Sequence, residues 1–126
     1  MSAVAVHIPY YATALRHDKL ADALADLTPE LLRLGALEVR VFRAQDDAYK
    51  FRQVLLLADK ADWTRIWNSE AFITFRTVTM AWYQKPLAYE MFETISQGTG
   101  AGVVDVFADD PFATPAPVDA TPVAAS

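Results

Sequence analysis

The sequence predicts an α+β fold whose elements follow the order β-α-β-β-α-β. Three observations support this fold class. Residues 3–8, 37–43 and 51–58 are segments of strand length, and in the first two Val, Ile or Leu occupies every second position. Residues 18–34 repeat leucine at steps of three and four, as an amphipathic helix does. Residues 62–83 hold all three tryptophans and carry a broad apolar stripe at helical spacing.

The composition indicates one globular domain. The chain has 126 residues, of which 53% are hydrophobic, and this is enough to build one core. It contains no cysteine, which excludes a disulfide scaffold and a thiolate metal site. No apolar run approaches the roughly 20 residues of a membrane span, and the N-terminus has no basic leader with a long apolar block. We therefore expect a cytoplasmic protein with no membrane partner.

The net charge of −5 is unevenly distributed. Residues 1–104 hold all 11 Lys and Arg and 12 of the 16 Asp and Glu, so this part is nearly neutral. The other four acidic residues lie in residues 105–126, which are rich in proline and alanine. We expect a folded domain at 1–104 and a mostly disordered tail at 105–126. The folded part has no basic surface for phosphates, so nucleic acid is not an expected partner.

The first strand and the first helix have recognisable ends. Pro9 is expected to end the strand, because it cannot donate to a sheet ladder. The helix is expected to begin near Asp18 and to stop at Gly35. Thr28 resembles an N-cap and Pro29 a first helical residue, so we predict a kink or two short helices there.

The next two strands are expected to form a hairpin. Residues 37–43 and 51–58 flank a turn-like segment at 44–50. Residues 54–57 do not alternate, so the third strand is predicted to lie in mid-sheet with both faces buried. The fourth strand is expected at 89–96.

Residues 62–83 are expected to form the helix around which the chain is organised. Asp62 is the predicted N-cap, and a break is predicted at Asn68-Ser69, where both side chains compete for backbone hydrogen bonds. Residues 73–79 are rich in β-branched side chains, which leaves a strand as a rival. The helix face predicted to cover the sheet consists of Trp63, Trp67, Ala71, Phe75, Val78 and Trp82. The face predicted to remain free for a ligand or partner consists of Phe72, Arg76, Thr79 and Tyr83.

This element order is that of the ferredoxin-like fold, in which helices cover one face of a four-stranded antiparallel sheet. The other face must be polar or be covered by something else. Because the first and third strands are apolar on both faces, we expect a homodimer. Its two sheets would pack face to face and bury apolar area, forming an α+β barrel.

Three segments carry a resemblance to a known family: FRQVLLLAD at 51–59, ADWTRIWNSEAF at 61–72 and WYQKPLAYEMFETI at 82–95. In this order they resemble the dimeric α+β barrel superfamily, and within it the antibiotic-biosynthesis-monooxygenase-like (ABM-like) domain. The resemblance covers about residues 3–97 and implies a ligand pocket between the sheet and the helices. Members of that superfamily include cofactor-free quinone-forming monooxygenases, haem-degrading enzymes, isomerases and cyclases.

The haem-degrading branch is a poor match. It resembles the SEAF segment at 69–72 but has a histidine four residues after its phenylalanine, where this chain has Arg76. Its asparagine in the first strand has no counterpart near Ala5 or His7. The resemblance still implies that Trp63 or Trp67 forms a wall of the pocket.

Eight residues are candidates for a site. His7, Arg76 and Tyr83 are the catalytic candidates, with His7 as a base and Arg76 as the holder of an anionic or phenolate oxygen. The candidate ligand contacts are Trp63, Trp67, Phe72, Trp82 and Tyr10. Each candidate also has a purely structural interpretation. His7 would be a strand-end histidine with a local partner, Arg76 would form a salt bridge or lie in solvent, and the aromatic side chains would be packing residues. The two histidines have no metal-binding spacing, so we expect no metal and no other cofactor.

Two classes of function remain open. The first is a small homodimeric enzyme with a cofactor-free monooxygenase-like activity on an aromatic, polyketide-like or quinol-like compound. The second is a non-catalytic module that binds a ligand or assembles with a partner protein. The tryptophan-rich stripe is compatible with both.

Overall fold

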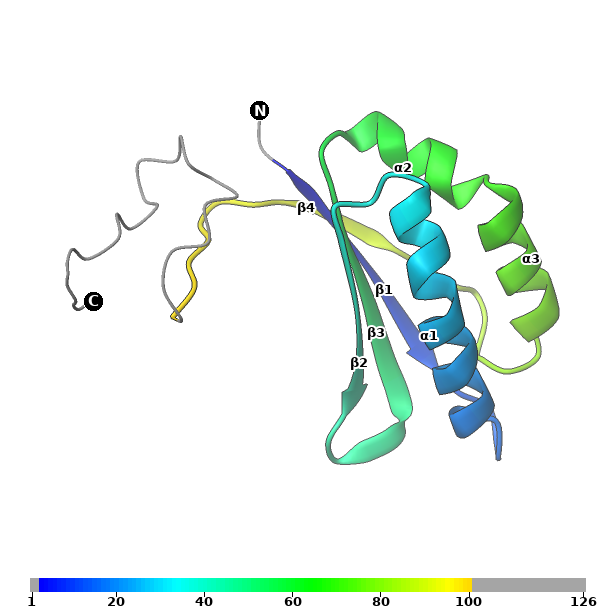
Figure 1. The fold of residues 1–126 in the computed structure, drawn as a ribbon. Helices are drawn as coiled ribbons and strands as arrows, with labels where there is room; N and C mark the ends of the chain where they lie inside the picture. The colour runs from blue at the N-terminus through cyan, green and yellow to red at the C-terminus, as the bar shows by residue number, and fades with distance from the viewer. Residues whose placement is uncertain (1–2, 101–126) are drawn as a thin grey trace. The chain divides into compact units, whose positions relative to one another are not determined.

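The structure, a computed structural model, describes residues 3–100 (Figure 1). Its helices and strands all lie within residues 1–93, which form one compact unit. Their bounds are β1 Val4–Tyr11, α1 His17–Arg33, β2 Glu38–Ala44, β3 Asp47–Leu57, α2 Lys60–Trp67, α3 Glu70–Thr79 and β4 Glu90–Glu93. The predicted element order is confirmed, with the second helix divided into α2 and α3.

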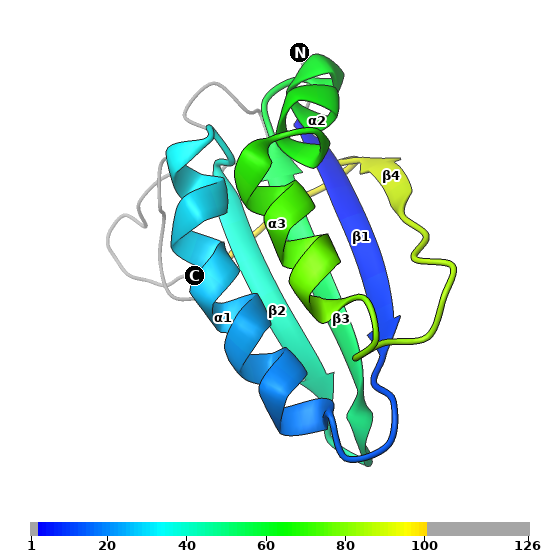
Figure 2. The same ribbon diagram turned by 90° about the vertical axis from the view of Figure 1, so that its right-hand side faces the viewer.

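The four strands form one antiparallel sheet in the order β2-β3-β1-β4. β1 pairs with β3 along its whole length, so that Val6 lies opposite Leu55 and Ile8 lies opposite Gln53. Helices α1 and α3 lie side by side across one face of the sheet, with α2 at one end (Figure 2). The two layers confirm the ferredoxin-like α+β fold.

Strand β1 continues through Pro9 to Tyr11, although the sequence suggested that Pro9 ends it. The Ala12 amide donates to the Tyr49 carbonyl of β3 at 2.8 Å, so the even-numbered residues direct their N–H groups toward β3. Pro9 has the opposite parity, and β4 pairs with β1 only as far as His7. The missing N–H of Pro9 therefore faces a position without a ladder partner, where proline is tolerated.

β2 and β3 form the predicted hairpin, but its turn is shorter than expected. Only residues 45 and 46 separate the two strands, because β3 begins at Asp47. The Asp47 carboxylate accepts the Tyr49 amide at 3.0 Å and the Tyr11 hydroxyl at 2.9 Å. This aspartate therefore lengthens the strand at a position that the sequence suggested was a loop.

Strand β3 lies in mid-sheet, as predicted, but only one of its faces is buried. The buried side chains face the helices and are Phe51, Gln53, Leu55 and Leu57. Val54 and Leu56 point to the other face and are half-buried. The prediction of burial on both faces is therefore wrong for the single chain, because no helix covers the second face.

Helix α1 is continuous, so the predicted kink at Thr28-Pro29 is wrong. The Thr28 hydroxyl does not cap a new helix but donates to the Leu24 carbonyl at 3.1 Å, within the same helix. Pro29 lies inside the helix and lacks the N–H that would bond one turn back. Burial of the leucine face holds the helix together across this position.

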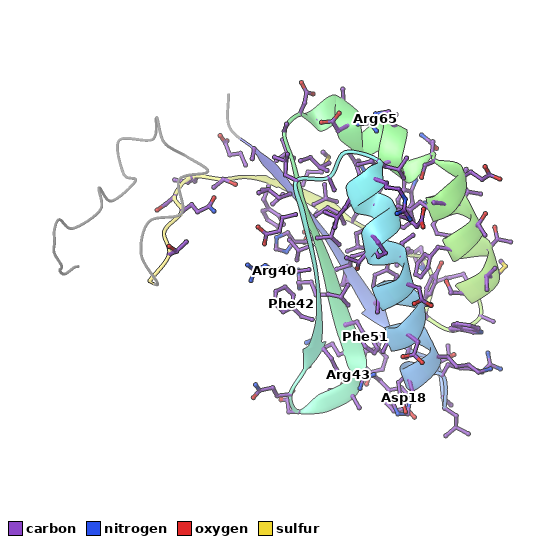
Figure 3. The ribbon with its side chains drawn as sticks, in the orientation of Figure 1. Asp18, Arg40, Phe42, Arg43, Phe51 and Arg65 are labelled. Atoms are coloured by element: carbon purple, nitrogen blue, oxygen red, sulfur yellow. The ribbon has the colours of Figure 1, made fainter. Side chains whose placement is uncertain are left out.

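Helix α1 ends as predicted at Gly35, which has a φ of 108°. The Gly35 amide donates to the Leu32 carbonyl at 3.0 Å and the Ala36 amide donates to the Leu31 carbonyl at 3.1 Å. These two bonds form the Schellman motif that glycine favours at this position. A guanidinium nitrogen of Arg65 (Figure 3) lies 3.2 Å from where a Cβ at position 35 would be.

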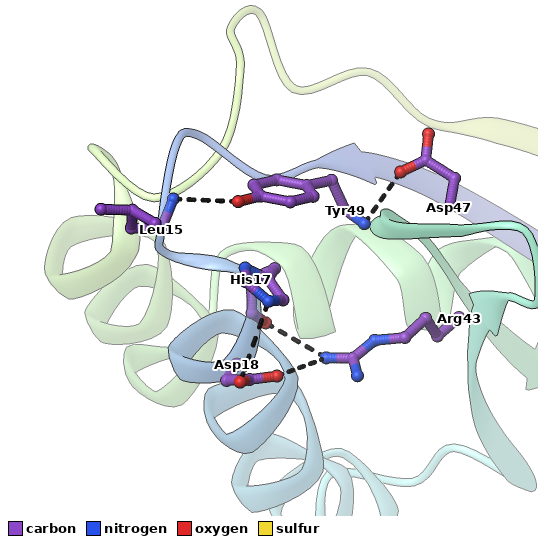
Figure 4. Close-up of polar contacts among 6 residues, drawn as sticks. All are labelled: Leu15, His17, Asp18, Arg43, Asp47 and Tyr49. Atoms are coloured by element: carbon purple, nitrogen blue, oxygen red, sulfur yellow. Dashed lines mark hydrogen bonds and ion pairs between the residues drawn. The ribbon is translucent and has the colours of Figure 1, made fainter.

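The start of α1 is fastened to the β2–β3 hairpin by the contacts in Figure 4. The His17 ring lies against Tyr49, with the ring centroids 4.3 Å apart. The Tyr49 hydroxyl accepts the Leu15 amide at 3.2 Å, and Arg43 of β2 lies 3.3 Å from the Asp18 carboxylate. These contacts account for His17 as a packing residue.

The predicted long helix is two separately capped helices. Asp59 caps α2, with its carboxylate accepting the amide two residues on at 2.7 Å, so the predicted cap at Asp62 is wrong. Ser69 caps α3, with its hydroxyl accepting the Phe72 amide at 3.2 Å. The predicted break is confirmed, and residues 73–79 are helical and not extended.

The break changes which residues of this stretch face the sheet. Val78, predicted to be buried, is 61% exposed. Phe72, Thr79 and Tyr83, predicted to lie on a free face, are each at most 4% exposed. The predicted division into two faces is therefore wrong, because α2 and α3 do not share one helical phase. Of the predicted free face, only Arg76 remains partly exposed.

Strand β4 is shorter than the predicted segment 89–96 and pairs with the first half of β1. The predicted boundary at 104 and the tail at 105–126 lie outside the described residues. Within residues 3–100, no helix has the length and apolar character needed to cross a membrane.

Candidate ligand site

Arg76 of α3 is at the centre of the candidate site. Its guanidinium carbon lies 3.7 Å from the centroid of the Trp67 ring and 5.2 Å from that of Phe72. Its Nη1 donates to the Trp67 carbonyl at 2.9 Å. Trp67 is the last residue of α2, where helix carbonyls have no partner along the helix. One side chain therefore caps α2 and also places a cation on an aromatic face.

Aromatic rings from α2, α3 and the segment before β4 form one cluster. The ring centroids of Trp63 and Trp67 are 5.2 Å apart, and Phe72 lies 5.2 Å from Trp67. Tyr89 lies 4.9 Å from Trp63 and 5.2 Å from Trp67. Three of the predicted ring candidates, Trp63, Trp67 and Phe72, are thus brought together and form a rigid apolar wall beside Arg76.

Two tyrosines lie beneath α3 and face each other. The rings of Tyr10 and Tyr83 are 5.5 Å apart in an edge-to-face arrangement. Burial raises the pKa of Tyr10 well above 10.0, with a further increase from Tyr83 and an opposing effect of Arg76. Burial also raises the pKa of Tyr83, opposed by a hydrogen bond with Thr79 and by Arg76. The hydroxyl groups of both tyrosines are therefore protonated near neutral pH and do not act as bases.

The charge of Arg76 is retained in this environment. Burial lowers its pKa from 12.5, whereas Tyr83 and Tyr10 act in the opposite direction. A guanidinium remains protonated at neutral pH under such perturbations. The site thus combines one permanent cation with hydroxyl groups and aromatic rings.

An open groove of about 610 Å³ lies next to these residues. Arg76, Met80 and Tyr83 form one side of it, and Lys85 and Leu87 belong to the connection that leads to β4. Its volume is in the range of small-molecule sites. Arg76 and Tyr83 belong both to the buried group and to the groove, so a ligand in the groove would lie beside both residues.

Besides Nδ1 of His17 at the start of α1, two buried side-chain atoms have no hydrogen-bond partner within the part of the chain that the structure describes. Gln53 is 0% exposed and its Oε1 accepts the Tyr10 hydroxyl at 2.8 Å, but its Nε2 is unpartnered. The same holds for Nε1 of the buried Trp63. An unpaired buried donor is unfavourable by about 1–3 kcal/mol, so each is a candidate contact for a bound molecule.

Sequence reasoning missed Gln53 and Thr79 as interior polar residues. Both are at most 1% exposed. A signal for Gln53 was present, because in the segment FRQVLLL at 51–57 it has the same strand parity as Phe51, Leu55 and Leu57. Thr79 donates to the Phe75 carbonyl at 2.7 Å within its own helix, and no sequence signal distinguished it from an exposed threonine.

Six of the eight predicted site residues lie on the helix side of the sheet. They are Tyr10, Trp63, Trp67, Phe72, Arg76 and Tyr83. Trp82 does not line the groove, and its ring instead lies 5.5 Å from the Lys19 ammonium of α1. The structure thus gathers most of the candidates and separates Trp82 and His7 from them.

His7 lies on the open face of the sheet, which carries no helix. Its Nδ1 is 3.2 Å from a guanidinium nitrogen of Arg52, and its ring centroid is 4.8 Å from that of Phe92. Burial lowers the pKa of His7 from 6.5, the charge of Arg52 lowers it further, and Glu90 opposes both. The structure therefore does not bring His7 together with the groove.

Within residues 3–100, no group of three His, Cys, Asp or Glu side chains has the arrangement of a metal site. The expectation that no metal or other cofactor takes part stays a prediction.

Solved structures of other proteins share this fold. A protein from Pseudomonas aeruginosa aligns with a TM-score of 0.69 and 18% identity, over 76% of this chain and 97% of that one. A protein from Nitrosomonas europaea assigned as an antibiotic biosynthesis monooxygenase aligns with a TM-score of 0.70 and 10% identity, over 75% and 91%. SnoaB, a cofactor-independent oxygenase from Streptomyces nogalater, aligns with a TM-score of 0.67 and 12% identity, over 77% and 97%.

Neither a family model nor the sequence of a curated protein matches this chain. At identities this low the structural matches show the fold alone. They confirm the fold expected from the resemblance to the ABM-like domain of dimeric α+β barrel proteins.

Proposed function

We propose that this protein binds a flat aromatic anion, such as a phenolate or an ionised quinol, in the groove beside Arg76. One observation carries the proposal: the Arg76 guanidinium stacks 3.7 Å from the Trp67 ring, and Arg76 is also one of the residues that line the groove. A cation beside aromatic and apolar walls suits a ligand with a negative oxygen and an extended ring system. Lys85 adds a second positive charge to the groove.

We further propose a cofactor-independent monooxygenase or related activity on such a polyketide-like compound. Similarity of fold to SnoaB, an oxygenase that needs no cofactor, supports this proposal. In the proposed reaction, the charge of Arg76 attracts the ligand oxygen, and the Tyr83 hydroxyl donates a hydrogen bond to it. The raised pKa of Tyr83 keeps this hydroxyl protonated. The ionised aromatic ring is then the electron-rich partner for dissolved oxygen. One oxygen atom bonds to a ring carbon, and the other leaves as water with the two hydrogens that the compound loses. Met80 and Leu87 of the groove keep solvent away from the ring. The proposal assigns no role to His7, since it lies on the other face.

Tryptophan fluorescence tests the binding step. A naphthohydroquinone titrated into the wild type under nitrogen should give saturable quenching. Arg76→Gln should weaken binding about tenfold or more, because one charge-assisted contact contributes about 1.5–3 kcal/mol. Arg33→Gln is the matched control, since this exposed arginine pairs with Glu30 of the same helix. Equal affinity in the two variants would contradict the proposed site.

Oxygen uptake tests the activity separately. With the same compound in air, the wild type should consume oxygen faster than the compound does alone, and Tyr83→Phe should slow turnover more than it weakens binding. Binding with no added oxygen uptake would refute the enzyme and favour the non-catalytic ligand-binding module.

We also propose that the protein is a cytoplasmic homodimer joined through the open face of the sheet. This face carries large apolar side chains: Phe42 is 47% exposed, Phe92 is 46% exposed and Tyr11 is 42% exposed. Figure 3 shows Arg40 and Phe42 projecting from this face, away from the helices. A four-stranded sheet with one apolar, uncovered face is a surface that a second copy can bury.

The oligomeric state is measured by light scattering or sedimentation. The wild type should have twice the chain mass of 14.0 kDa. Phe42→Glu should give the single-chain mass, because it places a charge in the proposed interface. Ile73→Glu is the control, since Ile73 is 45% exposed on α3 and should leave the mass unchanged. A wild type of single-chain mass at high concentration would disprove the dimer.

A further inference from the structure

Helices α1 and α3 enclose a second groove, of about 520 Å³, whose floor is apolar. Ala23 and Leu27 of α1 face Ala71, Phe75 and Val78 of α3 along it. Alanine at two of these positions leaves room between the helices, where larger side chains would fill the space. The groove shares no residue with the one beside Arg76.

The rim of this groove is acidic. Asp26, Glu30 and Glu70 line it, and no lysine or arginine does. Glu30 pairs with Arg33 of the same helix. Asp26 and Glu70 have no ion pair among the described residues, so two negative charges beside the groove are not neutralised.

Val78 leaves part of the apolar floor of this groove uncovered. It belongs to α3, lines the groove and is 61% exposed. A helix in a globular protein normally directs such a side chain to a core. An apolar floor with an acidic rim suits a partner that is apolar on one face and basic on the other.

We propose that the groove between α1 and α3 docks a cationic amphipathic helix of a partner protein. A third helix laid along two packed helices places its apolar side chains between them. Its lysine or arginine side chains then lie beside Asp26 and Glu70, which sets orientation and excludes acidic competitors. The same carboxylates repel an anionic lipid surface, so a membrane is not the occupant.

A synthetic helix tests the proposal. The probe is a fluorescein-labelled peptide of about 14 residues, roughly 21 Å long, with leucines on one face and lysines on the other. Two controls replace every lysine by glutamate, or keep the composition but reorder it so that the leucines do not align. The full-length protein should raise the fluorescence anisotropy of the first peptide alone, and salt should weaken this binding.

Variants assign the binding to the groove. Asp26→Asn combined with Glu70→Gln should weaken binding about fivefold, and Val78→Ser should weaken it by a similar factor. Controls are Asp46→Asn in the β2–β3 turn and Leu37→Ser, since Leu37 is 57% exposed before β2. Arg76→Gln should bind the peptide as the wild type does.

Three results overturn the proposal. They are no anisotropy change at the highest attainable protein concentration, equal binding of all three peptides, or equal affinity of groove variants and controls. Circular dichroism of each variant confirms that the fold is retained, so that loss of binding is not loss of structure.

Discussion

Replacing Tyr10 by phenylalanine and Gln53 by leucine together should leave the protein at least as stable as the wild type, although Tyr10→Phe alone should destabilise it. The Tyr10 hydroxyl donates to Gln53 Oε1 at 2.8 Å, and Gln53 Nε2 has no partner within residues 3–100. Both side chains are at most 2% exposed. The pair is thus one satisfied bond with one unsatisfied donor beside it.

The expected magnitudes follow from this inventory. Tyr10→Phe leaves the Gln53 acceptor buried without a donor, at a cost of about 1–3 kcal/mol. Gln53→Leu removes the unpaired amide but strands the Tyr10 hydroxyl, so the two effects nearly cancel, to within about 1 kcal/mol. The double variant removes all three polar groups and keeps similar volumes, so it should gain up to about 1 kcal/mol.

Urea denaturation of the wild type, the two single variants and the double variant gives a double-mutant cycle, provided that the m-value is the same for all four proteins. The double variant should be more stable than the sum of the single changes predicts. A loss of more than about 2 kcal/mol in the double variant would refute the reasoning, because it would mean that the Gln53 amide is satisfied in solution. The double variant also tests function, because a more stable protein with weaker quinol binding would show that the Tyr10–Gln53 pair contributes to binding.

Three further predictions concern stability. Ser69→Ala should lower the unfolding free energy by about 1 kcal/mol in urea denaturation, because the hydroxyl caps α3 through the Phe72 amide. Gly35→Ala should lower it by about 1 kcal/mol or more, since φ is 108° and the new Cβ would meet Arg65 at 3.2 Å; an unchanged midpoint would contradict the Schellman motif. Because the folded pKa of His7 lies below 6.5, the unfolding free energy should fall as pH drops below 6.5, and His7→Gln should flatten this pH dependence.

The element order could be read from the sequence, whereas several boundaries could not. Alternation and leucine spacing identify strands and helices because burial imposes these periods on the chain. Pro9 was misleading because its effect depends on which side of β1 lacks a partner strand. Thr28-Pro29 was misleading because packing of the leucine face overrides a local helix-stop signal.

The candidate site was only partly accessible to sequence reasoning. Helical spacing placed Arg76 near Phe72 and Tyr83, but it did not predict the contact of Arg76 with the Trp67 ring. A break of a single turn shifts helical phase, so a wheel drawn across Asn68-Ser69 placed Tyr83 on a free face although it is buried. His7 could be assigned to one parity of β1, but not to the face without helices. That assignment depends on whether the odd-numbered or the even-numbered side chains of β1 are large enough to fill the space under α1 and α3.

The bond from Arg76 to the Trp67 carbonyl makes the end of α2 a reporter of what the groove contains. An anion in the groove that attracts the Arg76 guanidinium would weaken its bond to the Trp67 carbonyl. Ligand binding in the groove and fraying of the end of α2 would then be linked equilibria. Amides in the final turn of α2 would then exchange with deuterium at a rate that rises with ligand concentration. Such a readout would respond to occupancy even for a compound that is never turned over.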